Sequence, residues 1–158
     1  MSVHYTLKGK KLGNLFVYDG NGLVEDRKKV IVAAEVLTPV SLDASNAGEV
    51  DVAASGATAA SVWAVLLQKV LDADPSLAIY PQTLADSSAF KNDEVTMAWG
   101  TARCEIGKDL YVGVIAINNL LGWNGTKYAI TTDATKAILK AETAGTGGTN
   151  RIVVKVLL

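Results

Sequence analysis

The amino-acid sequence predicts a mainly β protein with one inserted α-helix, an α+β arrangement whose body is an antiparallel β-sandwich or is barrel-like. Three observations support this class. Apolar and polar residues alternate in short runs, most clearly at 49–52 and 151–158. Gly, Asn and Asp residues, which favour turns, separate these runs. Between Ala57 and Asp72 the alternation gives way to an Ala- and Leu-rich stretch that predicts the helix.

Length and composition predict a folded chain with its own core. The chain has 158 residues, of which 49% are hydrophobic and 20% are charged, and a domain of this size buries most of its apolar surface without disulfides or metals. We expect an N-terminal arm or short strand at 1–11, and a single β-rich domain at 12–158.

Charge and hydropathy argue against two classes of partner. Fifteen basic and 16 acidic residues give a net charge of −1, which provides no general attraction for phosphates, so we expect no nucleic-acid partner. The longest apolar run, 62–67, is too short to cross a bilayer, and the N-terminal residues lack the apolar stretch of a signal peptide. We therefore expect no membrane partner and a soluble protein made in the cytoplasm.

The N-terminal third predicts strands and turns. Residues 12–18 suit a strand, the Asp-Gly-Asn-Gly sequence at 19–22 suits a turn, and residues 23–25 can return as the second strand of a hairpin. A buried strand follows at 28–42, and Pro39 is expected to break its hydrogen-bond ladder. Val50 and Val52 alternate with acidic residues, which predicts a further strand.

The predicted helix at 57–72 is apolar around most of its circumference. One stripe holds Val62, Val65, Leu66 and Val70, and an adjoining stripe holds Trp63, Leu67 and Leu71. Such a helix must be covered on most sides, either by its own domain or by a neighbour.

Residues 74–94 predict a long loop, because they contain two prolines and several turn-forming residues. Ile79, Tyr80 and Phe90 are its candidate anchors. Long loops in small domains are uncommon and often belong to interfaces.

The C-terminal third predicts a further set of strands. Residues 95–106 form one, the almost wholly apolar 110–117 is expected to be central in its sheet, and Asn124-Gly125 is a strong hairpin signal. Residues 136–142 suit either a strand, which we favour, or a short helix capped by Asp133. A flexible Gly/Thr stretch then leads to the terminal strand at 151–158.

The chemistry-bearing residues predict no enzyme, no cofactor and no metal site. His4 is the single histidine and Cys104 the single cysteine, so a serine triad, an internal disulfide or a zinc site lacks its components. Cys104 occupies an alternate position of a predicted strand, which favours a buried structural thiol. Acidic pairs flank turns or solvated faces, where charged residues are expected.

Large apolar residues suggest a protein interface instead. Aromatic side chains most often build cores, but they are also preferred anchors between proteins. Our candidate interface residues are Tyr5, Leu7, Phe16, Trp63, Leu67, Ile79, Tyr80, Phe90 and Trp123.

The stretch "GWNGTKYAITTDATKAILKAETAGTGGTNRIVVKVLL" resembles the C-terminal part of tailed-bacteriophage capsid decoration proteins, also called head-stabilising or cement proteins. The likeness covers mainly residues 110–158 and consists of a hairpin, a "TTDAT" turn, an Ala-rich strand, a Gly/Thr loop and a terminal strand.

The resemblance implies a virion structural protein that is assembled in the host cytoplasm. It would bind the outer surface of the capsid, bridge major capsid subunits, and form a homo-oligomer, a trimer being favoured. Two alternatives stay open. One is another phage structural subunit, such as a tail tube, a head–tail connector or a head fibre. The other is a carbohydrate- or ligand-binding β module that uses Trp99 or Trp123 as a stacking platform.

Overall fold

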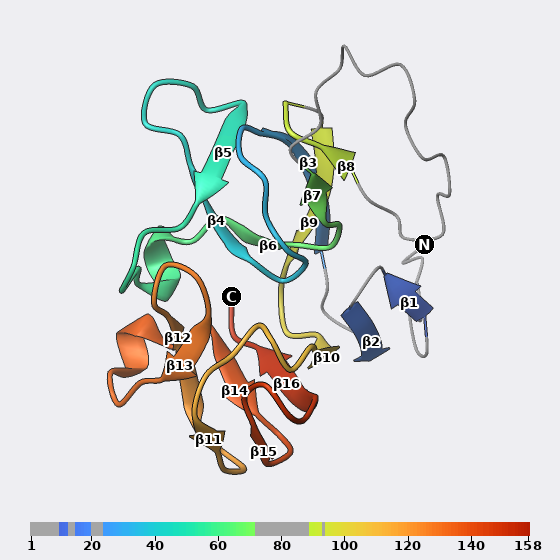
Figure 1. Cartoon of the computed structure of the whole chain (residues 1–158). Coiled ribbons are helices and arrows are strands. Elements are labelled where there is room, and N and C mark those ends of the chain that lie inside the picture. The colour runs from blue at the N-terminus through green and yellow to red at the C-terminus, as the bar shows by residue number, and fades with distance from the viewer. Residues whose placement is uncertain (1–9, 13–14, 20–23, 72–88, 93) are drawn as a thin grey trace, which may run out of the picture.

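A computed structural model describes residues 10–12, 15–19, 24–71, 89–92 and 94–158. The chain forms a small closed barrel and a larger curved sheet, which lie against each other (Figure 1). The predicted mainly β class is confirmed. The arm at 1–11 lies outside the described residues except for its last two positions, and so does most of the predicted loop at 74–94.

Five strands close the barrel in the order β3-β5-β4-β6-β9. The β3–β5 pair is parallel and the other pairs are antiparallel. The strands are β3 (Val24–Val30), β4 (Pro39–Leu42), β5 (Glu49–Val52), β6 (Ala64–Leu66) and β9 (Glu94–Trp99). Their inward side chains join Val70 in one apolar cluster: Val30, Val40, Val50, Ala64, Leu66, Val95 and Met97.

The second layer is a seven-stranded antiparallel sheet in the order β1-β2-β10-β16-β14-β12-β13. Its strands are β1 (Lys10–Leu12), β2 (Leu15–Asp19), β10 (Arg103–Ile106), β12 (Leu120–Trp123), β13 (Tyr128–Ile130), β14 (Leu139–Ala141) and β16 (Ile152–Val156). Two short pairs complete the fold: β7 (Val70–Leu71) with β8 (Ala89–Phe90), and β11 (Val114–Ile115) with β15 (Gly145–Thr146).

The predicted α-helix at 57–72 is wrong. The segment forms one 3-10 turn, η1 (Ala59–Ser61), followed by β6 and β7. Ala64 and Leu66 point into the barrel, whereas Val65 and Leu67 point the other way, into the core shared with the sheet. A strand buried on both faces is apolar at every position, and hydrophobic periodicity cannot distinguish it from a buried helix.

Several other strand predictions need correction. The predicted strand at 28–42 is divided between β3 and β4, and the one at 95–106 between β9 in the barrel and β10 in the sheet. The hairpin at 12–25 does not form, because β2 pairs with β1 and β10 while β3 belongs to the barrel. Pro39 begins β4 and does not interrupt a strand, which suits a residue without an N–H group. The run at 110–117 is not a central strand, since it contains only an isolated bridge from Tyr111 to Tyr128 and the two-residue β11, which pairs with β15.

The predictions for residues 120–158 agree with the structure more closely than those for the earlier segments. Asn124-Gly125 lies in the turn between β12 and β13, with Trp123 opposite Tyr128. Asp133 caps a short 3-10 turn, η3 (Ala134–Lys136), and the favoured strand follows as β14. In β16 the residues Ile152, Val154 and Val156 are buried, as the alternation predicts.

Two buried hydrogen bonds join the barrel to the sheet. The Tyr128 hydroxyl donates to the Leu37 carbonyl at 2.8 Å, and the Trp123 indole N–H donates to the Ala53 carbonyl at 3.0 Å. Leu37 has a φ of +61°, a conformation that L-residues adopt at a cost of about 1–2 kcal/mol. Its N–H donates to Leu66 in β6 at 2.7 Å, so both of its backbone polar groups stabilise this strained conformation.

Replacing Tyr128 with Phe is expected to destabilise the fold by about 1–3 kcal/mol, because a buried carbonyl at Leu37 loses its donor. Urea unfolding monitored by tryptophan fluorescence measures the change. Tyr111→Phe is the matched control, since it removes a hydroxyl that also donates to a backbone carbonyl, that of Asn150, but does not join the barrel to the sheet. Equal losses in the two variants would contradict a special role for the Tyr128–Leu37 bond.

Candidate protein-interaction surface

The structure places the predicted interface residues in very different surroundings. Trp123 and Leu67 are buried in the shared core, at 4% and 2% exposure, as expected of residues that build the fold. Trp63 is half-buried. Its ring centroid lies 5.7 Å from that of Trp99, and the ammonium of Lys28 lies 4.9 Å from the Trp63 centroid.

The remaining candidates are not brought together by the described structure. Phe16 lies in β2 and Phe90 in β8. Tyr5, Leu7, Ile79 and Tyr80 lie outside the described residues.

Exposed aliphatic side chains indicate a different surface. Val112, Val114 and Ile117 are 38%, 72% and 59% exposed, and all belong to one short stretch around β11. We call these three residues the tip surface, because β11 and β15 lie at the end of the sheet that is remote from the barrel (Figure 1). Exposed apolar residues that lie close together in one segment can mark a binding site.

Buried neighbours anchor the tip surface on both sides. Tyr111 and Ile115 flank Val112 and Val114, and each is 1% exposed. The Val112 N–H donates to the Tyr128 carbonyl at 2.9 Å, which ties the stretch to the edge strand β13. The outward direction of the exposed side chains is therefore set by packed residues and backbone hydrogen bonds.

Glycines allow β15 to approach this stretch closely. A Cβ atom at Gly145 would lie 2.5 Å from the Ile152 Cγ2 and 2.8 Å from the Tyr111 hydroxyl. One at Gly147 would lie 2.6 Å from the Tyr111 carbonyl oxygen. The Gly/Thr stretch, expected to be flexible, thus forms a packed strand and turn that support the tip surface.

Gly145→Ala is expected to destabilise the fold by about 1–3 kcal/mol, because the added methyl group overpacks the contact with Ile152 and Tyr111. Thermal or urea unfolding measures the loss. Gly107→Ala is the matched control, because an added methyl group there would meet no atom within 4 Å and the φ of Gly107 is not positive. If the Gly145→Ala variant were as stable as this control, the contact of β15 with Ile152 and Tyr111 would have space for the added methyl group.

Cys104 has the surroundings of a structural thiol. It is 2% exposed in the shared core, and burial, with a smaller effect from Glu142, raises its pKa to about 12. The nearby Tyr128 hydroxyl also has a raised pKa, chiefly because it is buried. A thiol held in its neutral form is a poor nucleophile.

These raised pKa values predict alkaline sensitivity. A group whose pKa is higher in the folded state stabilises the fold fully below its unfolded pKa, and that contribution falls as the pH rises toward the folded pKa. For Cys104 the unfolded pKa is 9.0 and the folded pKa about 12, so stability should decline between these limits. Urea unfolding across this range should show a shallower decline for Cys104→Ala than for the wild type, and equal slopes would contradict the assignment.

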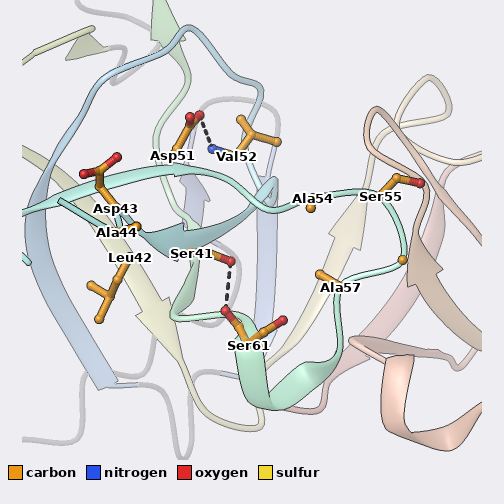
Figure 2. A pocket seen from close by; sticks show the side chains of 11 residues that line it. Ser41, Leu42, Asp43, Ala44, Asp51, Val52, Ala54, Ser55, Ala57 and Ser61 are labelled. Atoms are coloured by element: carbon orange, nitrogen blue, oxygen red, sulfur yellow. Dashed lines mark hydrogen bonds between the residues drawn. The ribbon is translucent and has the colours of Figure 1, made fainter. Parts of the chain in front are cut away.

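A groove lies on the outer wall of the barrel, between β4, β5 and η1 (Figure 2). It has a volume of about 460 Å³. Its apolar lining comes from Val52, several alanines and Leu42, which is 42% exposed. Its polar lining includes Asp43, Asp51 and three serines, and its lining residues among those described include no Lys or Arg.

The groove's polar groups are partly engaged. The Asp43 carboxylate accepts hydrogen bonds from the N–H groups of Ser45 and Asn46, at 2.8 and 3.0 Å. The Ser41 hydroxyl donates to the Ser61 carbonyl at 2.8 Å. These bonds fix the shape of the rim and leave the acidic character of the groove intact.

The described part of the chain bears on two further kinds of site, a metal centre and a membrane-spanning helix. It contains no group of three or more His, Cys, Asp and Glu residues placed to hold a metal ion. None of its helical turns has the length and apolarity needed to cross a bilayer.

The fold is similar to a solved phage structure. No protein-family model matches the chain, and no curated protein sequence matches it. The structure resembles "head fiber gp8.5 N base in bacteriophage phi29", with a TM-score of 0.52 over 85% of this chain and 94% of that one. The sequences are 9% identical, so the likeness concerns the fold.

Only a faint signal in the sequence pointed to the tip surface. The apolar run at 110–117 contains Gly113, which adopts a φ of +83°, and it is followed directly by Asn118-Asn119. A glycine inside a strand pattern can mark a bend, not a central strand. That signal could have placed Val112 and Val114 in a turn, but it could not have shown that they face solvent.

Proposed function

We propose that this protein is a structural component of a bacteriophage virion, located on the head, and that it acts by binding other proteins without catalysis. The observation that carries the proposal is the fold similarity to the head fibre base over most of both chains. The resemblance of residues 110–158 to decoration proteins supports the same general role independently, because it rests on sequence.

The tip surface supplies a candidate contact with the shell. Three aliphatic side chains fall far short of the roughly 800 Å² that each partner buries in a standard interface. A contact of this size is weak in a single copy. On a shell with repeated sites, several linked copies can bind together, and avidity then raises the overall affinity.

Two finer roles follow from the two resemblances. In the first, the protein bridges major capsid subunits and stabilises the head, as decoration proteins do. In the second, it is the base of a head fibre, and the fold similarity favours this role. Copy number separates them, because a decoration protein is present at most capsomer junctions, whereas a fibre base can be sparse.

A carbohydrate-binding module is a weaker alternative. Trp123 is 4% exposed and its N–H is already bonded to Ala53, so it offers no stacking platform. Trp99 is half-buried against Trp63, with the two ring planes inclined at 58°. A sugar ring would therefore contact two inclined indole rings, those of Trp63 and Trp99, and not the open face of a single ring on which it could stack.

The proposed function predicts binding to purified heads. Val114→Asp is expected to lower the amount that cosediments with heads by about ten-fold, because the most exposed aliphatic residue of the tip surface would carry a charge into an apolar contact. Mass spectrometry of virions gives the copy number.

Thr132→Asp is the matched control, since it adds the same charge at an exposed residue outside the tip surface. Absence of the wild-type protein from virions would exclude the proposed role. Normal binding by Val114→Asp would exclude the tip surface as the contact while leaving the role itself open to other surfaces.

A further inference from the structure

We propose that the groove beside Leu42 binds the segment around Leu7-Lys8 of a second copy of this chain. The inference extends the proposed function but is tested separately from it, because self-association is measured without phage particles.

The groove has the chemistry to bind an apolar side chain next to a basic one. Leu42 exposes 42% of its surface on the rim, and small residues such as Ala54 and Ala57 also line the groove (Figure 2). Asp43 and Asp51 add negative charge beside this apolar surface. Ser41 and Asp51 are paired across β4 and β5. Asp51 follows Val50, whose side chain points into the barrel, and successive side chains of a strand point to opposite faces. The side chains of Ser41 and Asp51 therefore lie on the barrel's outer wall.

The N-terminal residues have the complementary pattern. Positions 1–11 hold three of the 15 basic residues and none of the 16 acidic ones. Apolar Val3, Tyr5 and Leu7 alternate with polar neighbours, and Lys8 follows Leu7 directly. Residues 1–9 lie outside the described residues, so their partner is inferred from this complementarity and from their attachment to β1.

Sheet geometry excludes the groove of the same copy. β1 is one edge of the seven-stranded sheet. The groove lies near the other edge, where the N–H of its lining residue Gly56 donates to Trp123 at the end of β12. Five strand spacings separate β1 from β12, a path of about 24 Å along the curved sheet, and Figure 1 shows the two strands on opposite sides of the molecule.

Leu7 cannot cover that distance within one copy. It is three residues from Lys10, the first residue of β1, and three residues span at most about 11 Å. The groove that Leu7 and Lys8 can reach therefore belongs to a neighbouring copy. The contact joins two different surfaces, so it is head-to-tail, and repeating it produces either a closed ring or an open filament.

Cysteine cross-linking tests this pairing on the full chain. Thr6→Cys protein, which keeps Leu7 and Lys8, is mixed with Ser55→Cys protein, and a short bis-maleimide is added. Ser55 is an exposed residue of the groove lining. The natural Cys104 contributes little background, because it is buried with a raised pKa.

We expect a mixed dimer that forms about ten-fold faster than in a control mixture of Thr6→Cys with Lys108→Cys, since docking raises the local concentration of the paired thiols. Lys108 is exposed and is not one of the residues that line the groove. A rate equal to the control would overturn the proposal. So would a concentration-independent cross-link within single molecules of the Thr6→Cys/Ser55→Cys double variant.

Association of the uncross-linked protein gives a second, independent measurement. By light scattering across a dilution series, Leu42→Asp should weaken self-association about ten-fold or more, because an apolar contact is lost. Lys8→Glu should weaken it about two- to five-fold, as expected of an exposed ion pair, and Asp51→Lys should restore the Lys8→Glu variant. The proposal would be overturned if the wild-type protein were monomeric at every concentration of the series. It would also be overturned if neither Leu42→Asp nor Lys8→Glu changed the self-association.

Discussion

Strand β6 is buried on both faces, and this double burial couples the two layers of the molecule. Ala64 and Leu66 fill the barrel, while Val65 and Leu67 fill the core shared with the sheet. Neither layer could expose its half of this strand to water without losing apolar burial worth several kcal/mol. The buried Tyr128–Leu37 and Trp123–Ala53 hydrogen bonds then fix how the layers are positioned.

The shared core extends to the tip surface. Tyr111 and Ile115 belong to the same apolar cluster as Val65 and Leu67, so the exposed residues between them are held by the interior of the protein. Close packing transmits position well, because well-packed side chains leave little room to move. A small apolar contact on such a base loses little conformational entropy when it binds, which suits the attachment role proposed above.

The sequence predicted the C-terminal strands well and the helix badly, for the same reason. Where one face of a strand is buried, as in Ile152–Val156, the alternation of apolar and polar residues identifies the strand and its inward face. Where both faces are buried, as in β6, that alternation disappears. The run at 110–117 failed in the opposite direction: its apolar residues suggested a central strand, yet Val114 is 72% exposed.

The sequence by itself determined the β class, the Asn124-Gly125 turn, the inward face of β16 and the buried state of Cys104, because each follows from local periodicity or turn chemistry. Tertiary structure decided which strands pair, which apolar residues are exposed, and where the groove lies. These depend on contacts between residues far apart in the chain, such as Tyr128 with Leu37 and Gly145 with Tyr111. No local pattern contains that information, since the same apolar side chain fits a core or a partner equally well until its neighbours are in place.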